Sequence, residues 1–350
     1  MLYRYKIMPR SPLITSLMPK SPLMTPLMSD TLFGHFCWAL LYLRGEDFLT
    51  DFLDSYGKDK PAPLLFSSAF LSGHLPRPDL PPMSRDQANK FVSAHFGNNI
   101  KARYLGFSRL KGWSKIRLIK MEQWLSLKDG YANEVLYKTF ASENVQSFVS
   151  NTETEVSSSN TINRISGAVE QEGGGLFQRE KIWYHEGTEL DLYIEAGDGE
   201  IKDLAGWFLT EYLPEHGFGA DKSVGMGSLS VFPDDTFDPG MLEVKDPNAR
   251  LSLSAASFRG MEKYPAFYRL NTKFGKLGGS YSVTSPTGGH PKPFKKPVLM
   301  FEPGAVFFTP DKLNSVPLLD RVHSDSRIRH YGIPLTLPFK TRENSPYAAA

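Results

Sequence analysis

Cysteine is nearly absent from this chain, which has a single one, Cys37, in 350 residues. One thiol excludes an internal disulfide framework, a cysteine-rich zinc site and a cysteine-held iron–sulfur cluster, and it fits a reducing compartment. Long apolar runs are also missing: residues 31–43, the most apolar stretch, are too short for a membrane-spanning helix of about 20 residues. Residues 1–6 contain no apolar signal-peptide core. We therefore expect a cytoplasmic protein with no membrane or lipid partner.

Neither sign of charge is in excess, because 40 Lys and Arg against 38 Asp and Glu leave a formal net charge of +2. The total charge therefore identifies no class of partner, and any electrostatic signal must be local. With 41% hydrophobic and 22% charged residues, wholesale disorder, collagen and coiled coil are excluded. The length predicts about two domains.

Hydrophobic periodicity predicts an α+β fold. Residues 2–7 alternate as a strand does, and apolar residues recur at helical spacing after an N-cap at Ser29 or Asp30. Further expected elements are a helix over residues 46–57, a buried strand over 64–71, a helix over 86–96 capped by Ser84, neighbouring strands over 176–184 and 190–194, a helix over 201–217 and a strand around 229–231. Without insertions this order resembles an elaborated ferredoxin-like βαββαβ unit, which is also the topology of the common RNA-recognition module.

Two further segments are set apart by composition. Residues 8–17 (MPRSPLITSL) are followed by a near copy at 18–27 (MPKSPLMTPL). We interpret this duplication as a lengthened, proline-stiffened loop, with a ligand for a proline-binding domain as the alternative. Residues 142–163 are rich in Ser, Thr, Asn and Glu, which predicts a mobile insertion or protruding loop. An aspartate-rich linker at 234–240 predicts a boundary between a domain over 1–233 and a smaller, strand-rich domain over 234–350, with strands at 298–301 and 305–308 joined by a turn.

The most informative local motif is the glycine-rich run at residues 217–227 (GFGADKSVGMG). Its glycines, Gly217, Gly219, Gly225 and Gly227, allow positive φ and close backbone approach, and their amides can converge on phosphate oxygens. Lys222 would add charge and Ser223 a hydroxyl. The run is neither a Walker A loop nor a dinucleotide fingerprint, because the predicted order is helix, loop, strand. A purely structural connection between the two elements is the alternative.

Positive charge is concentrated in two segments that also contain aromatic residues. Residues 101–120 hold seven cations and no acidic residue, among them Arg103, Arg109 and Lys111, with Tyr104, Phe107 and Trp113 between them. Residues 259–296 hold eight cations, including Arg269 and Lys273, against the single Glu262. Cations for phosphates and aromatic faces for bases predict a single-stranded nucleic-acid groove. The alternative is two solvated polar faces whose aromatics point into the core.

Signs of an enzyme are few. The eight histidines are scattered, and no hydrolase or metalloprotease motif is present. Asp234, Asp235 and Asp238 are more typical of a solvated turn than of a metal site. His35, near the start of the first predicted helix, is the one candidate for a general base in RNA cleavage. We predict no cofactor and no bound metal.

Three motifs in order carry a resemblance to a known family. Residues 29–40 (SDTLFGHFCWAL), residues 163–165 (NRI) leading to 173–177 (GGGLF), and the 217–227 run resemble the RAMP superfamily of CRISPR proteins. Within it, the chain is most similar to the Cas five-like (Csm four) subunits of type III-A effector complexes. The resemblance covers residues 1–232 well and the second part loosely, through 273–285 and 330–335 (HYGIPL).

The resemblance implies a non-catalytic, RNA-binding subunit in antiviral defence. Such subunits hold the repeat-derived 5′ handle of the guide RNA (crRNA) and contact a Cas ten-type large subunit and an adjacent RAMP backbone subunit. By similarity, Thr31, His35, Asn163, Arg164 and the 217–227 run would face the RNA. The resemblance also implies a protruding hairpin that wedges between nucleotides, expected within residues 130–166, and a degenerate RNA-recognition-like second domain.

Two alternatives stay open at this point. One is a RAMP endoribonuclease that processes the guide precursor with His35 as general base. The other is an unrelated two-domain metabolic protein that binds a phosphate through the glycine-rich run.

Overall fold

The computed structural model describes residues 1–15, 27–57, 60–146, 151–160, 162, 176–282 and 293–345. It mixes helices and strands throughout, so the predicted α+β class is confirmed. In these residues no helix has the length and apolar character needed to cross a membrane.

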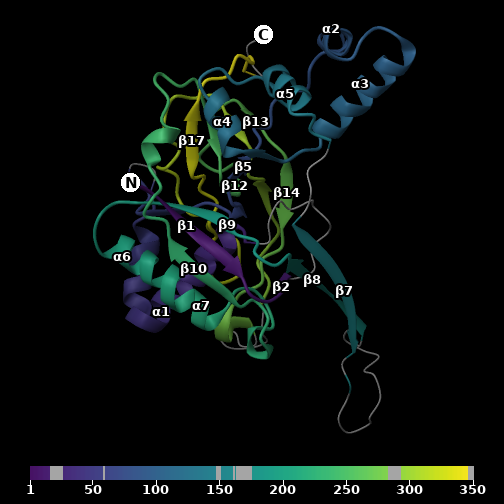
Figure 1. Ribbon diagram of the computed structural model, residues 1–350. Coiled ribbons are helices and arrows are strands. Elements are labelled where there is room, and N and C mark those ends of the chain that lie inside the picture. Colours follow the sequence, from purple (N-terminus) through teal and green to yellow (C-terminus); the bar gives the residue numbers. More distant parts are fainter. Residues whose placement is uncertain are drawn as a thin grey trace.

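An antiparallel sheet of ferredoxin-like topology lies at the centre of the N-terminal part (Figure 1). Its order is β10 (Leu229–Pro233), β1 (Leu2–Pro9), β9 (Leu190–Ala196) and β3 (Leu64–Phe66), with β4 (Phe70–Leu71) also paired to β9. The chain runs from β1 to β3 through α1 (Ser29–Asp54), and from β9 to β10 through α6 (Glu200–Trp207), a π-helical turn (Phe208–Tyr212) and α7 (Leu213–His216). The predicted βαββαβ order is therefore confirmed.

Helix α1 packs its apolar face against this sheet. Leu32, Phe36 and Leu40 recur at helical spacing and are fully buried. The two helices expected over residues 29–57 form one element with a kink at Gly45, whose φ of 87° is non-helical. The N-cap is Met28 and neither Ser29 nor Asp30, because both of these side chains contact the C-terminal part of the chain.

Some predicted strands pair differently in the structure. The 64–71 strand is interrupted into β3 and β4. Strand β8 (Leu176–Tyr184) does not neighbour β9; it lies between β2 (Leu13–Thr15) and β7 (Thr152–Asn160) in a separate sheet. The expectation of a loop at residues 8–17 is thus wrong for β2, and that of a loop at 142–163 is wrong for β7. Most of the second copy, at 18–27, lies outside the described residues.

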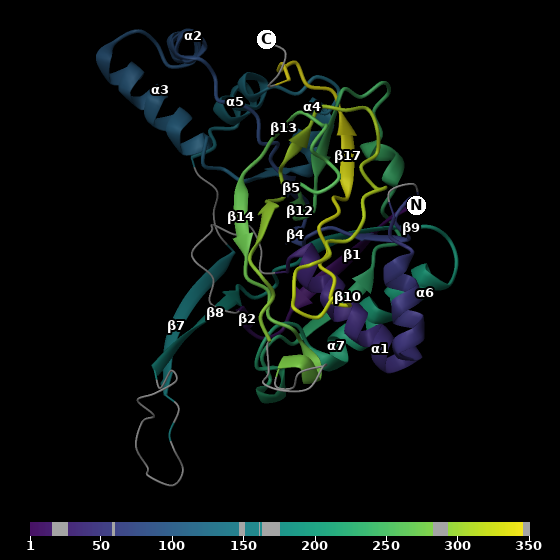
Figure 2. The ribbon, with the colours of Figure 1, turned by 180° about the vertical axis from the view of Figure 1, so that it is seen from behind.

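The β7–β8 hairpin and a helical arm project from the same flank of the molecule in both views (Figures 1 and 2). We call α2 (Arg85–His95) and α3 (Ile100–Trp113) the helical arm. Helix α2 begins at the predicted cap, Ser84, which forms a capping box with Gln87. The arm is inserted between β5 (His74–Pro76) and β6 (Leu118–Lys120), which pair with each other, and α4 (Met121–Leu127) and α5 (Asn133–Ser142) follow.

The C-terminal part is rich in strands, as predicted. One sheet has the order β13 (Ala266–Phe267), β16 (Val306–Phe307), β11 (Ala249–Ser252), β17 (Thr336–Phe339), and another β12 (Ala256–Ser257), β15 (Val298–Phe301), β14 (Leu270–Lys273). Strands β15 and β16 flank the predicted turn but belong to different sheets. Side chains pack across the predicted boundary at 233/234: the ring of Tyr331 stacks on Phe33 of α1 at 4.7 Å. The division into two domains stays a prediction.

Candidate nucleic-acid interface

The glycine-rich loop, residues 217–227, folds back on itself and is bonded to the segment that leads into β2. Phe218 N–H donates to the Gly227 carbonyl over 2.8 Å, Ala220 N–H to Ile14 O over 3.1 Å, and Gly227 N–H to Pro12 O over 2.9 Å. The loop is therefore held against backbone from the beginning of the chain.

Glycine is required in this loop mainly by close backbone contacts. A Cβ on Gly227 would lie 1.9 Å from the Phe218 carbonyl oxygen, and one on Gly219 would lie 2.7 Å from Ile14 O. At Gly225 a Cβ would meet nothing within 4 Å, although φ is +83°. The amides of Gly217, Gly225 and Gly227 all donate to backbone carbonyls of the protein. The expected convergence of glycine amides on a phosphate is thus wrong for these three amides.

The part of the loop that remains accessible is its tip. Lys222, Ser223 and Val224 form one exposed 3-10 turn after Asp221, which adopts a left-handed conformation with φ of 57°. The Asp221 carboxylate forms an ion pair with Arg179 of β8. The tip therefore presents the Lys222 ammonium and the Ser223 hydroxyl. Through Arg179 the loop contacts β8 in addition to β2, which belongs to the same sheet.

His35 connects α1 to this loop. Its imidazole stacks on the ring of Phe218, with 5.0 Å between the ring centroids and 29° between the planes. Burial lowers the pKa of His35 to about 4, and the positive charge of Lys222 acts in the same direction. At neutral pH the imidazole is uncharged, which is the form that best fits a stacking role beside a lysine.

Thr31 and Lys273 also meet, although they come from opposite ends of the chain. The Lys273 ammonium donates to Thr31 Oγ1 over 3.2 Å and pairs with the Asp30 carboxylate over 3.0 Å. His330 Nε2 lies 3.8 Å from the same carboxylate, and Lys295 Nζ lies 3.3 Å from His330 Nδ1. This buried cluster fixes β14 and the His330 segment against the start of α1.

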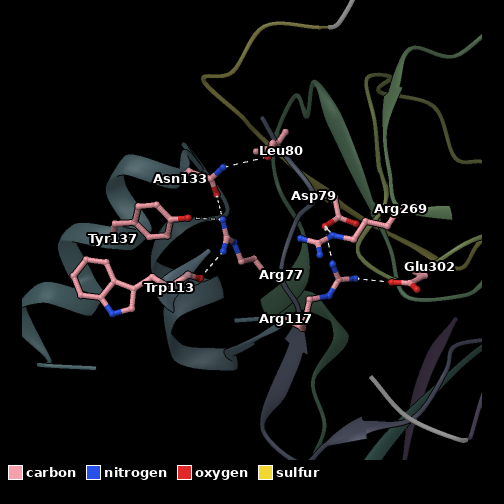
Figure 3. Close-up of polar contacts among 9 residues, drawn as sticks. All are labelled: Arg77, Asp79, Leu80, Trp113, Arg117, Asn133, Tyr137, Arg269 and Glu302. Carbon is pink, nitrogen blue, oxygen red and sulfur yellow. Dashed lines mark hydrogen bonds and ion pairs between the residues drawn. The ribbon is translucent and has the colours of Figure 1, made fainter. Parts of the chain in front are cut away.

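The remaining predicted cations lie elsewhere. Arg103, Arg109 and Lys111 are on α3 of the helical arm, away from the glycine-rich loop (Figure 1). Arg103 donates to Asn89 Oδ1 over 2.9 Å, and Arg269 donates to Asp79 over 2.9 Å at the base of the arm (Figure 3). The predicted set is thus divided between two surfaces.

Several side chains of the two basic segments are already held by the protein itself, as the alternative of core-facing aromatics expected for some of them. Trp113, expected to stack on bases, is 1% exposed, and its indole N–H donates to Val145 O over 2.7 Å. Arg117 pairs with Glu302 over 3.0 Å, and Arg259 is paired with Asp320. Trp113 is therefore enclosed in the core, and Arg117 and Arg259 are neutralised by acids of the protein.

Asn163 and Arg164 lie outside the described residues. The protruding hairpin expected within residues 130–166 has its first strand, β7, in that range and its second, β8, beyond it. Val156 and Trp183 are exposed on it, at 54% and 43%. Phe218 and Arg179 belong to this surface without having been predicted from the sequence, and only their position beside glycine-rich segments could have suggested them.

No group of three or more His, Cys, Asp or Glu side chains that could hold a metal is found among the described residues. Asp234, considered above as a possible ligand, instead pairs with Arg4 over 2.8 Å. Cys37 is close to Lys295, and burial raises the pKa of its thiol to about 12, so it is an inert core thiol.

Comparison with known proteins assigns the family. A sequence model described as the RAMP superfamily matches residues 24–230, more than half of the chain. The chain belongs to the RAMP superfamily. No curated protein matches the sequence. Among solved structures, this RAMP is similar to a chain of a Csm1–Csm4 cassette in complex with AMPPNP, with 14% identity, coverage of 98% of this chain and 100% of that chain, and a TM-score of 0.50.

A second solved relative is a chain of a Csm3–Csm4 subcomplex of the type III-A CRISPR–Cas interference complex. It shares 12% identity over 96% of this RAMP and 99% of that chain, with a TM-score of 0.50. At such identities the likeness establishes the fold alone. It extends over the C-terminal part as well as the family-matched region, so nearly the whole chain shares the fold of these two chains.

Proposed function

We propose that this RAMP is an RNA-binding subunit of a type III-A CRISPR effector complex in the cytoplasm, serving antiviral defence. In this proposal it holds the 5′ handle of the crRNA on the surface formed by the glycine-rich loop tip and the start of α1. It contacts a Cas ten-type large subunit and an adjacent RAMP backbone subunit.

The stacking of His35 on Phe218 is the observation that carries the proposal. It brings the start of α1 and the loop, two of the three motifs of the resemblance, into one surface. That surface offers the exposed Lys222 and Ser223 for phosphate and sugar oxygens. Contacts of this kind hold a nucleic acid in position, while sequence is left to base pairing or to exposed bases.

The β7–β8 hairpin supports a second part of the proposal. It projects beyond the body of the molecule (Figure 2). Its side chains Val156 and Trp183 are exposed. Apolar and aromatic side chains can separate neighbouring bases by stacking against them. We propose that this hairpin lies against the RNA where the handle ends.

We propose a non-catalytic role for His35. A general base works best when its pKa is near the operating pH, and the pKa of His35 is lowered to about 4. Such an imidazole is a weak base, and its ring face is already in contact with Phe218. The endoribonuclease alternative therefore has no favourable feature at this residue.

The partner assignments take support from the two solved relatives, which are chains of complexes described as Csm1–Csm4 and Csm3–Csm4. A chain with the same overall fold can use corresponding surfaces for a large subunit and for a backbone subunit.

The deciding experiment is purification of the tagged protein from the organism that encodes it, followed by sequencing of the RNA that accompanies it. We expect guide RNAs that share one repeat-derived 5′ end. The variant Lys222→Gln should retain less of this RNA when the preparation is washed at raised salt, whereas Lys245→Gln, which changes an exposed lysine outside the proposed surface, should keep it. RNA of random sequence, or none in the assembled complex, would end the proposal.

A further inference from the structure

The outer face of α3 on the helical arm is an exposed apolar surface for which the proposed RNA site has no use. We define this face as Ile100, Tyr104, Phe107 and Lys111, with Lys101 and Leu105 on its flank. Ile100 is 89% exposed, Tyr104 77%, Leu105 50% and Phe107 38%. Residues 100, 104, 107 and 111 follow the spacing of one helix face, so these side chains form a continuous stripe. Three large apolar side chains on one exposed helix face, with Leu105 beside them, are typical of a binding surface.

The opposite face of α3 packs inside the molecule, partly against α2 of the same arm. Leu110 and Trp113 are buried, and Gly106 lies so close to α2 that a Cβ there would be 2.6 Å from Val92 Cγ1. The outer stripe is therefore not a displaced core face. Within the described part of the chain, no element packs over it.

The arm is held rigidly at its base, which suits a docking element. The Arg77 guanidinium donates to Trp113 O over 2.8 Å, to Asn133 Oδ1 over 2.8 Å and to the Tyr137 hydroxyl over 2.9 Å (Figure 3). It thereby joins the end of α3 to α5 and to the strand-edge segment that carries Arg77. A preordered helix loses little conformational freedom when it binds, so more of its contact energy appears as affinity.

Charge and side-chain type together indicate what covers this face. Residues 101–120 contain no acidic residue, and Lys101 and Lys111 are exposed beside the apolar stripe. Ile100, the most exposed side chain of the face, offers neither a ring face for bases nor a donor for phosphates, and the Phe107 ring already lies beside the Arg103 guanidinium, 5.7 Å from its centroid. Arg103, which would suit RNA better, is turned toward Asn89 of α2. An apolar helix face with a basic border fits a protein groove of complementary charge.

We propose that the outer face of α3 docks into an apolar groove, bordered by Asp and Glu side chains, on a different protein. Ile100 and Tyr104 are the central anchors, and Lys101 and Lys111 pair with the acidic border. This interface lies on a different surface from the RNA site and does not depend on RNA binding.

The first test places a photo-crosslinker on the face of the full-length protein in the organism that encodes it. Tyr104→p-benzoylphenylalanine should give one crosslinked species, a different protein, whose linked peptide contains apolar residues next to Asp or Glu. Ala94→p-benzoylphenylalanine, at an exposed position of α2 on the same arm, should not give it. A crosslink to RNA, a crosslink to a second copy of this chain, or no specific crosslink would each overturn the proposal.

The second test uses no crosslinker. It measures how much of the partner protein identified in the first test co-purifies with this chain. Ile100→Asp should reduce its recovery by about tenfold or more, the loss expected for an interface anchor. Because an aspartate is favourable at the first position of a helix, this variant should keep α3 intact. Ala94→Asp adds the same charge elsewhere on the arm and should leave recovery unchanged.

A charge exchange then tests the chemistry of the groove. Replacing the acids near the crosslinked peptide with lysine should weaken binding, and Lys101→Glu with Lys111→Glu should restore it. Failure of this rescue would overturn the acidic border. RNA from the same preparations is sequenced separately, so loss of the guide RNA with retention of the crosslink would end the proposed function and leave this inference standing.

Discussion

The imidazole of His35, in the second turn of α1, stacks on the ring of Phe218 in the glycine-rich loop with 5.0 Å between the ring centroids. Both rings belong to motifs that are far apart in the sequence. The contact makes the loop conformation depend on α1, because Phe218 N–H is also bonded to Gly227 O inside the loop. A substitution of His35 should therefore change the conformation of the glycine-rich loop, even if His35 takes part in no reaction.

His35→Phe should preserve the stack and His35→Ala should remove it. We expect His35→Ala to lower the unfolding free energy by about 1 kcal/mol, the size of an aromatic pair contact, and to weaken RNA binding. His35→Phe should retain most of both properties. Denaturant unfolding and an RNA-binding titration measure these effects. Metal-independent cleavage of repeat RNA that disappeared in His35→Phe would contradict the non-catalytic role.

Gly227→Ala and Gly225→Ala should differ sharply although both residues have positive φ. The first places a Cβ 1.9 Å from the Phe218 carbonyl oxygen, so we expect a loss of more than about 3 kcal/mol or failure to fold. The second meets nothing within 4 Å and should cost about 1 kcal/mol. Thermal unfolding of the two variants provides the comparison, and equal stability would show that the loop can be rearranged without cost.

Lys222→Gln should weaken RNA binding without affecting the fold. The side chain is exposed at the loop tip, so its removal exposes no apolar core. Loss of one phosphate contact should make the plot of log affinity against log salt concentration less steep by about one unit. The measurement is an RNA titration at several salt concentrations, with Lys245→Gln as the control. An unchanged salt dependence would mean that Lys222 faces no phosphate.

Arg77→Met should loosen the helical arm. Removing the guanidinium leaves Asn133 Oδ1 and the Tyr137 hydroxyl without this donor, while Trp113 O keeps the Ile116 N–H, and we expect a cost of about 2 kcal/mol. Amide hydrogen exchange in α3 should become faster. Arg44→Met, which removes an exposed ion pair with Glu200, should cost no more than about 1 kcal/mol. Unchanged exchange in α3 would show that the arm is held by apolar packing alone.

The stability of the protein should decrease as the pH falls below about 6.5. Burial, with a contribution from Lys295, lowers the pKa of His330 to about 3, so only the unfolded chain takes up a proton there between about pH 6.5 and 3. One extra proton on the unfolded chain lowers the unfolding free energy by about 1.4 kcal/mol per pH unit. Urea unfolding at pH 6 and pH 5 measures this slope, which should be about 1 kcal/mol per pH unit smaller in His330→Gln. An identical slope in the variant would contradict the buried, neutral His330.

Much of the fold could be predicted from the sequence because its signals are local. Alternation over residues 2–7, helical spacing in α1 and the Ser84 cap of α2 each depend on neighbours a few residues away. The family resemblance likewise rested on short motifs, and the match to the RAMP superfamily confirmed it. Strand partners were less predictable: a strand pattern shows which face is buried and does not show which strand lies beside it, so β8 was placed next to β9 when it pairs with β2 and β7.

The candidate site shows the same division. The sequence by itself determined that residues 217–227 form a glycine-rich turn after a helix and that cations gather in two segments. Only the tertiary structure decided which of these groups remain available, because a cation's role depends on the acids and carbonyls that reach it from distant segments. Lys273 meets Asp30 and Arg269 meets Asp79, whereas Lys222 stays at an exposed tip. The same physical reason separates Trp113, enclosed by its arm, from Tyr104, which the packing of α3 leaves in solvent.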